Sequence, residues 1–155
     1  MSELSDRLQT DLVTAMKARE VLTLSTLRMA IAAIRNEQVA GKKARVLSEA
    51  EVVTVLNREV AKRRDSAEAY TAGQRPELAA KELAEVEVLQ RYLPTALTDE
   101  ELDAIVAEEV SAAAASLGGA PSMKQMGLVI KAVNERAAGR AQGAKVAAKV
   151  KAALA

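Results

Sequence analysis

Apolar residues recur along the chain at intervals of three and four positions, which is the spacing of one face of an α-helix. Leu4, Leu8 and Leu12 form one such stripe near the start, and Leu27 and Ile31 continue the pattern in the next segment. No segment shows the alternation of apolar and polar residues that is typical of a half-buried strand. The chain is therefore predicted to be all-α.

Start and stop signals divide this pattern into seven helices. Ser48, Thr98 and Ser122 each precede a Glu or Gln by three positions, and this capping box satisfies free backbone N–H groups at a helix start. Pro76 suits a first helical turn, whereas Pro94 ends the helix before it. The predicted helices cover approximately residues 2–18, 21–39, 48–71, 76–93, 98–117, 122–137 and 144–154.

The segment Tyr92–Leu97, which contains Pro94, is the predicted boundary between two parts of the chain. Residues 1–93 are expected to form an N-terminal bundle of four helices. Residues 94–155 are expected to form a C-terminal subdomain of three helices.

The cores of both parts are predicted to consist of Leu, Val, Ile, Met and Ala, because the chain has no Phe or Trp and only two Tyr. Such small side chains suit closely packed helices. Helical spacing places Met16 on the inward face of the first helix and Leu83 on that of the fourth.

Composition excludes most familiar catalytic sites. The chain has no Cys and no His, which removes disulfides, thiolate nucleophiles, the commonest metal ligand and the base of Ser-His-Asp arrangements. The sequence Gly41-Lys42-Lys43 does not form a phosphate-binding P-loop, because the upstream glycine and the Ser or Thr after the lysine are missing. We therefore expect no catalytic residue, no metal site and no cofactor.

The location of the protein is expected to be cytoplasmic. The first residues lack the basic and apolar regions of a signal peptide, and no segment is apolar enough to span a bilayer. A membrane partner is not expected.

Charge is unevenly distributed, although the net charge is only +1. Residues 98–109 hold six acids and no base, whereas residues 121–155 hold seven Lys or Arg and one acid. Basic surfaces attract phosphates, but Lys and Arg also solubilise ordinary helix faces, so both interpretations stay open. The candidate RNA-binding residues are Lys124, Lys131, Arg136, Arg140, Lys145 and Lys149, with a secondary basic patch at Lys62, Arg63 and Arg64.

Four motifs follow one another along the chain: Leu24–Met29, Tyr92–Pro94, Ser122–Gly127 and Gly139–Gly143. This ordered set resembles the YqeY-like family over residues 4–154. Within the family pattern, Gly127 would let helices approach closely and Gly143 would begin the last helix. Three further matches, at Thr26, Arg28 and Glu37, would form either a buried polar network or a binding site.

That family is similar to the C-terminal tail of the B subunit of the glutamine-dependent Asp/Glu-tRNA amidotransferase. The resemblance implies a two-part helical module that binds tRNA or structured RNA, while chemistry occurs elsewhere. A carbon–nitrogen ligase activity with glutamine as amido-N-donor would belong to the larger enzyme, and we expect no enzymatic activity here. A partner amidotransferase or another protein is also implied.

Two alternatives remain open from the sequence. The chain could be a protein–protein adaptor that uses an apolar groove between the two parts. It could also be an enzyme with a carboxylate or Lys mechanism, since neither His nor Cys is present.

Overall fold

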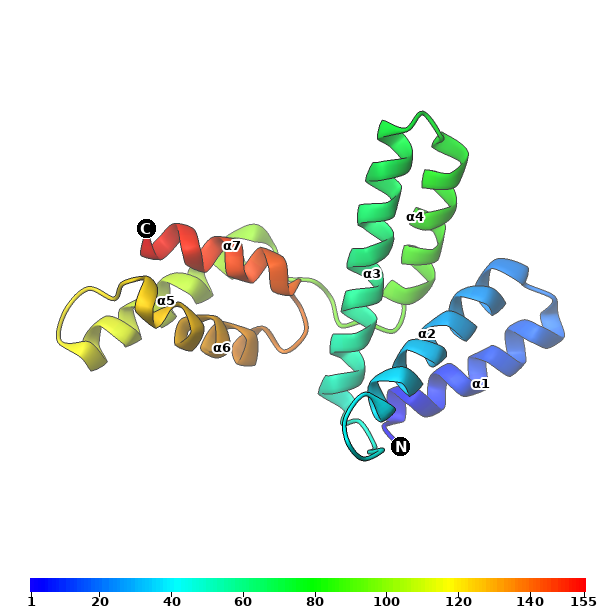
Figure 1. Ribbon diagram of the computed structural model, residues 1–155, viewed down its shortest axis with the longest axis horizontal. Helices are drawn as coiled ribbons and strands as arrows, with labels where there is room; N and C mark the ends of the chain where they lie inside the picture. The colour runs from blue at the N-terminus through cyan, green and yellow to red at the C-terminus, as the bar shows by residue number, and fades with distance from the viewer. The chain divides into compact units, whose positions relative to one another are not determined.

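The computed structural model describes residues 1–155 and contains seven α-helices, one short 3-10 helix and no strand (Figure 1). The predicted all-α class with seven helices is confirmed. The elements are α1 (Glu3–Ala18), α2 (Val21–Val39), α3 (Glu49–Ala72), α4 (Pro76–Gln90), α5 (Asp99–Leu117), η1 (Met123–Gln125), α6 (Met126–Ala137) and α7 (Gly143–Leu154).

All three capping boxes form. The Glu51 carboxylate accepts a hydrogen bond from the Ser48 backbone N–H at 2.8 Å, and the Glu101 carboxylate accepts one from Thr98 at the same distance. The Ser122 box differs from the prediction, because it opens η1 and α6 begins only at Met126. Local sequence therefore determines where these helical segments begin.

The chain divides into two compact units, which we call unit 1 (Met1–Leu93) and unit 2 (Pro94–Ala155). In unit 1, α1 and α2 form one helical hairpin and α3 and α4 form another (Figure 1). The two hairpins share one apolar core, whose fully buried leucines are Leu8, Leu27, Leu56 and Leu89.

Two predicted core positions of unit 1 are exposed instead. Met16 retains 52% of its accessible surface and Leu83 retains 49%. In α4 the buried face includes Glu85 and Val88, and Leu83 lies outside it. Glu85 faces inward because its carboxylate pairs with the buried Arg63 of α3. A largely apolar helix carries more than one possible stripe, and packing selects among them.

In unit 2, three helices enclose a smaller core made mostly of valine. Val133, Val146 and Val150 are completely buried at its centre, with Leu102 from α5. Burying one such side chain contributes about 1.5–3 kcal/mol, so this unit depends on tight helix contacts rather than large side chains. No helix in either unit is long and apolar enough to cross a membrane.

Candidate functional site

Three of the predicted RNA-binding cations are paired with acids of α5. Lys145 contacts Asp99, and the Lys149 ammonium lies 2.6 Å from the Asp103 carboxylate. The hydrogen bond from Lys145 lowers the pKa of the Asp99 carboxyl, and the one to Asp103 raises the pKa of Lys149. Each of these two cations therefore already has an anionic neighbour.

Arg136 at the end of α6 is paired in the same way. Its guanidinium lies 2.6 Å from the Glu108 carboxylate and 3.3 Å from that of Glu109. Both hydrogen bonds raise the pKa of Arg136. The acidic helix α5 thus neutralises much of the basic surface that charge counting predicted for α6 and α7.

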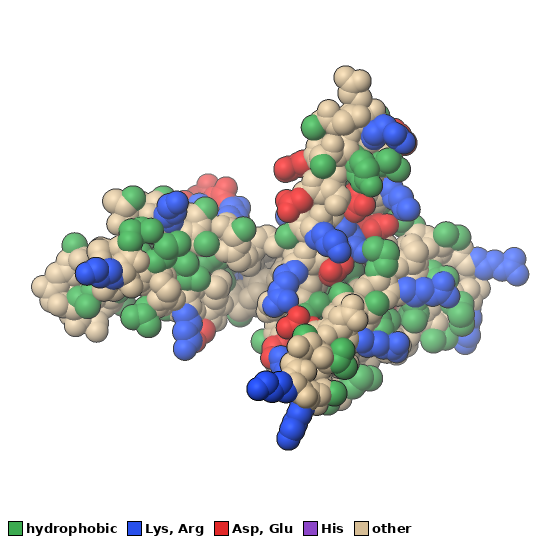
Figure 2. Space-filling view, in the orientation of Figure 1, with side chains coloured by type: hydrophobic (Ala, Val, Ile, Leu, Met, Phe, Trp, Pro, Cys, Tyr) green, Lys and Arg blue, Asp and Glu red, His purple; other side chains and the backbone are tan.

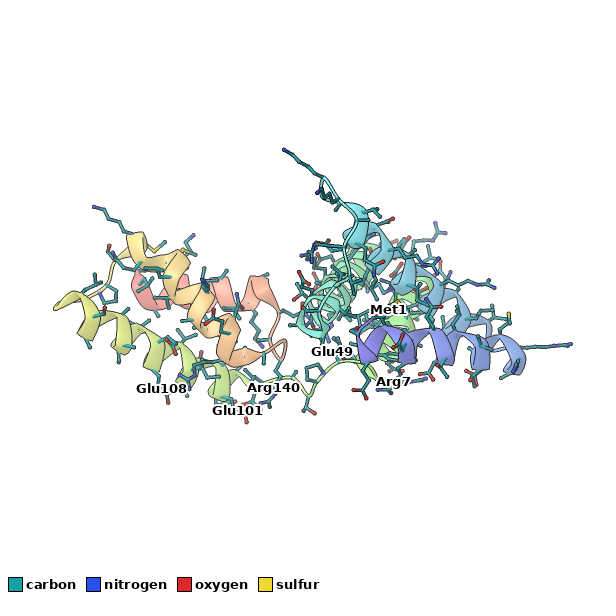
Figure 3. The ribbon with its side chains drawn as sticks, turned by 90° about the horizontal axis from the view of Figure 1, so that it is seen from below. Met1, Arg7, Glu49, Glu101, Glu108 and Arg140 are labelled. Atoms are coloured by element: carbon teal, nitrogen blue, oxygen red, sulfur yellow. The ribbon has the colours of Figure 1, made fainter.

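Arg140 connects the turn after α6 to the segment that precedes α5 in unit 2. Its Nε donates a hydrogen bond of 2.7 Å to the Thr95 carbonyl, and its own carbonyl accepts one of 2.8 Å from the Leu97 N–H. Figure 3 shows Arg140 close to the start of α5, the helix from which Glu101 and Glu108 project. Arg140 therefore fixes the turn between α6 and α7 to the start of unit 2.

Among the main candidates of unit 2, Lys124 and Lys131 are the two whose side chains form no hydrogen bond or ion pair, and both are exposed. Helical spacing places them on one face of the η1–α6 segment, with Gly127 and Leu128 between them. Leu128 is 73% exposed and lies outside the core of unit 2, so it adds apolar surface to this face. We call Lys124, Gly127, Leu128 and Lys131 the α6 face.

Gly127 does not have the packing role that the resemblance implies. A Cβ at this position would meet no atom within 4 Å, so no helix of the structure lies close against it. Glycine within a helix costs about 0.5–1 kcal/mol relative to alanine. This glycine leaves the backbone of the first turn of α6 open to an approaching surface. Gly143, the second glycine of the family pattern, is the first residue of α7.

Arg63, the central residue of the predicted secondary basic patch, is buried. Arg63 is only 3% exposed, and its guanidinium lies 2.9 Å from the Glu85 carboxylate and 2.7 Å from that of Glu59. It is part of the core and cannot contact RNA, while Lys62 and Arg64 on either side are exposed. The signal was present in the sequence, because Arg63 lies on the apolar stripe of α3.

The N-terminal family residues do not form one polar network. Thr26 is buried and donates to the Leu22 carbonyl at 2.8 Å, and Glu37 accepts a hydrogen bond of 3.0 Å from Arg58. Arg28 is exposed and lines a hollow between α1 and α2. Each of the three therefore has separate surroundings. No group of three or more Asp or Glu side chains could hold a metal ion.

Comparison with known proteins gives one family. A model described as Yqey-like protein matches residues 5–154, nearly the whole chain. The chain is 30% identical over 86 residues to altered inheritance of mitochondria protein 41, mitochondrial, of Candida glabrata, covering 56% of this chain and 47% of that protein. It is 28% identical over 96 residues to the protein of the same name in Saccharomyces cerevisiae strain S288c, covering 62% and 51%. The chain thus spans about half the length of these curated relatives, and neither description states an enzymatic activity.

Proposed function

This chain belongs to the YqeY-like family, and we propose that it is a non-enzymatic helical module that binds tRNA or another structured RNA. The α6 face is the observation that carries the proposal. The resemblance to the tail of the tRNA amidotransferase B subunit supports tRNA as the class of ligand. In this proposal the chain is an accessory to amidotransferase-like chemistry that an enzyme partner performs.

The chemistry of the α6 face suits a sugar–phosphate backbone. Lys124 and Lys131 have no acidic partner to displace, so each can release counterions when it contacts a phosphate. Gly127 offers open backbone, and Leu128 offers apolar surface to a ribose or a base. Figure 2 shows hydrophobic and basic side chains side by side on the visible face of unit 2. Arg136, Lys145 and Lys149 are secondary contacts, because their α5 carboxylates compete with phosphate.

Phosphate and shape contacts dominate this mode of binding. The chain has two tyrosines and no other aromatic residue, so stacking of bases on aromatic rings contributes little. We therefore propose recognition of folded RNA rather than of a single-stranded sequence. Cytoplasmic residence remains part of the proposal, and the word mitochondrial belongs to the names of the yeast relatives.

The first test neutralises the α6 face in the full-length chain. Lys124→Gln/Lys131→Gln is expected to weaken binding of fluorescein-labelled tRNA about tenfold at low salt and to reduce the salt slope by about 2, one for each lost phosphate contact. Fluorescence anisotropy over a salt series measures both quantities.

The matched control is Lys81→Gln/Arg91→Gln, which makes the same charge change on exposed positions of unit 1. Its affinity should stay within about twofold of wild type, because non-specific attraction depends mainly on local phosphate contacts. Absence of tRNA binding by the wild-type chain at low salt would refute the proposal. An equal loss in both variants would remove the α6 face as the site.

A further inference from the structure

A groove runs along the α1–α2 hairpin of unit 1. It consists of two adjoining hollows of about 240 and 220 Å³, which share Gln9, Ile31 and Arg35 in their walls. Every residue that lines them belongs to α1, to α2 or to the two positions before α1, so no third helix covers the groove.

The floor of the groove is apolar. Ile31 and Ile34 form its base, Leu12 lies at one end and Met1, which is 71% exposed, at the other. Leu12 lies about three turns along the chain from Met1, the residue before the N-cap of α1, which corresponds to about 16 Å at a rise of about 1.5 Å per residue. The groove is therefore about as long as three turns of a helix.

The rim of the groove is cationic. Arg28 and Arg35 stand seven positions apart on α2, hence on one face, and both are exposed. Neither guanidinium forms a hydrogen bond or an ion pair, and no Asp or Glu lines either hollow. Glu37, the acid of α2, is instead paired with Arg58 of α3.

We propose that this groove binds an acidic amphipathic helix of a partner protein. The occupant places apolar side chains over Leu12 and Ile31 and two carboxylates, one near Arg28 and one near Arg35. Bidentate pairing of arginine with a carboxylate gives such contacts direction as well as strength. A helix seated along a two-helix groove is a common mode of peptide recognition.

The apolar floor favours a protein over RNA as the occupant. Ile31 and Ile34 are themselves nearly buried, so the apolar surface that water still reaches belongs to Leu12 and Met1 at the two ends. A nucleic acid would cover these two side chains with polar backbone, whereas the apolar face of a helix removes them from water at about 25 cal/mol per Å². The two arginines would then be satisfied by carboxylates at a spacing of seven, two turns of the bound helix. This surface lies in unit 1, and the inference does not depend on RNA binding by unit 2.

The test uses a designed helical peptide of about 15 residues, with two Glu seven positions apart and Leu on the same face between them. Titration into the full-length chain is followed by the δ1-methyl NMR signals of isoleucine. The chain has four isoleucines, of which Ile31 and Ile34 line the groove, whereas Ile105 and Ile130 lie in unit 2. We expect the peptide to shift the first two signals and to leave the other two unchanged.

Charge reversal completes the experiment. Arg28→Glu/Arg35→Glu should weaken peptide binding at least tenfold, and a peptide carrying Lys in place of both Glu should bind this variant better than it binds wild type. Lys81→Glu/Arg91→Glu, the control with the same charge change on α4 and its C-cap, should bind the acidic peptide within about twofold of wild type.

Two outcomes would overturn the inference. One is that the acidic peptide leaves the Ile31 and Ile34 signals unchanged. The other is that tRNA shifts these signals and loses affinity in Arg28→Glu/Arg35→Glu, which would assign the groove to RNA. The proposal for the α6 face has its own test in the same experiment, because it predicts that tRNA shifts the NMR signal of Ile130, the residue next to Lys131. Failure of one proposal is therefore distinguishable from failure of the other.

Discussion

Arg63 is the one cation that folding removes from water. Its guanidinium is held between the carboxylates of Glu59 and Glu85, and no buried side-chain polar atom in the structure lacks a hydrogen-bond partner. The arrangement joins α3 to α4 at a fixed register. A buried pair adds little stability over well-packed apolar residues, but removing one partner leaves an uncompensated charge.

Arg63→Met is therefore expected to lower the free energy of unfolding by about 3 kcal/mol, because Glu85 stays buried without its cation. Urea denaturation followed by circular dichroism measures the change. The double variant Arg63→Met/Glu85→Leu should regain at least half of the loss. A double variant as unstable as the single one would show that packing, not charge, makes Arg63 important.

Tyr92 joins the end of α4 to α1. Its hydroxyl donates a hydrogen bond of 2.6 Å to the Asp11 carboxylate, and the Arg7 guanidinium lies 4.8 Å from the centre of its ring. Burial, followed by the hydrogen bond to Asp11, raises the pKa of Tyr92 well above its usual value.

Tyr92→Phe is expected to cost about 1–2 kcal/mol at neutral pH, the contribution of one hydrogen bond to a charged group at a partly exposed site. A raised pKa in the folded state means that this contribution is complete below the unfolded-state value near 10 and is lost as the pH rises toward the folded-state value. Denaturation of both proteins from pH 7 to pH 11 should show their difference shrinking above about pH 10. A difference that stays constant over this range would contradict the assignment.

At the scale of elements, helix α5 acts as an internal counterion for α6 and α7. Its carboxylates form ion pairs with Lys145, Lys149 and Arg136, and these pairs lie at the surface of unit 2. Exposed pairs contribute little to stability. Their main effect is on binding, because they reduce the number of cations that are free for phosphate.

Asp99→Asn/Asp103→Asn is expected to strengthen tRNA binding several-fold and to steepen its salt dependence, since Lys145 and Lys149 then become free for phosphate. The control Glu68→Gln/Glu87→Gln removes the same charge from exposed positions of unit 1. Anisotropy titrations at two salt concentrations compare them. An equal gain in both variants would trace the effect to net charge alone.

Helix starts could be predicted from the sequence, whereas the pairing of the candidate site could not. The capping boxes depend on residues three positions apart, so Ser48 and Thr98 identify their own helices. The contact between Lys149 and Asp103 joins residues 46 positions apart, and only the folded unit brings them together. Charge counting found both groups of residues and could not show that they neutralise each other.

At the scale of the whole molecule, the fold class followed from helical periodicity, which is maintained from one end of the chain to the other. Family membership rested on the order of several motifs, and the match over residues 5–154 confirms it. The groove could not have been predicted, because Leu12 and Ile31 come from separate helices and their own spacing marks both as ordinary core positions.

The distribution of aromatic residues gives this molecule a spectroscopic asymmetry. Both tyrosines, Tyr70 and Tyr92, belong to unit 1, and the chain has no tryptophan or phenylalanine. Near-ultraviolet absorbance and fluorescence therefore report on unit 1 alone, while unit 2 is silent. Far-ultraviolet dichroism records the helices of both units. A melting curve recorded at the two wavelengths would separate the unfolding of the units in the intact chain, without labels or truncation.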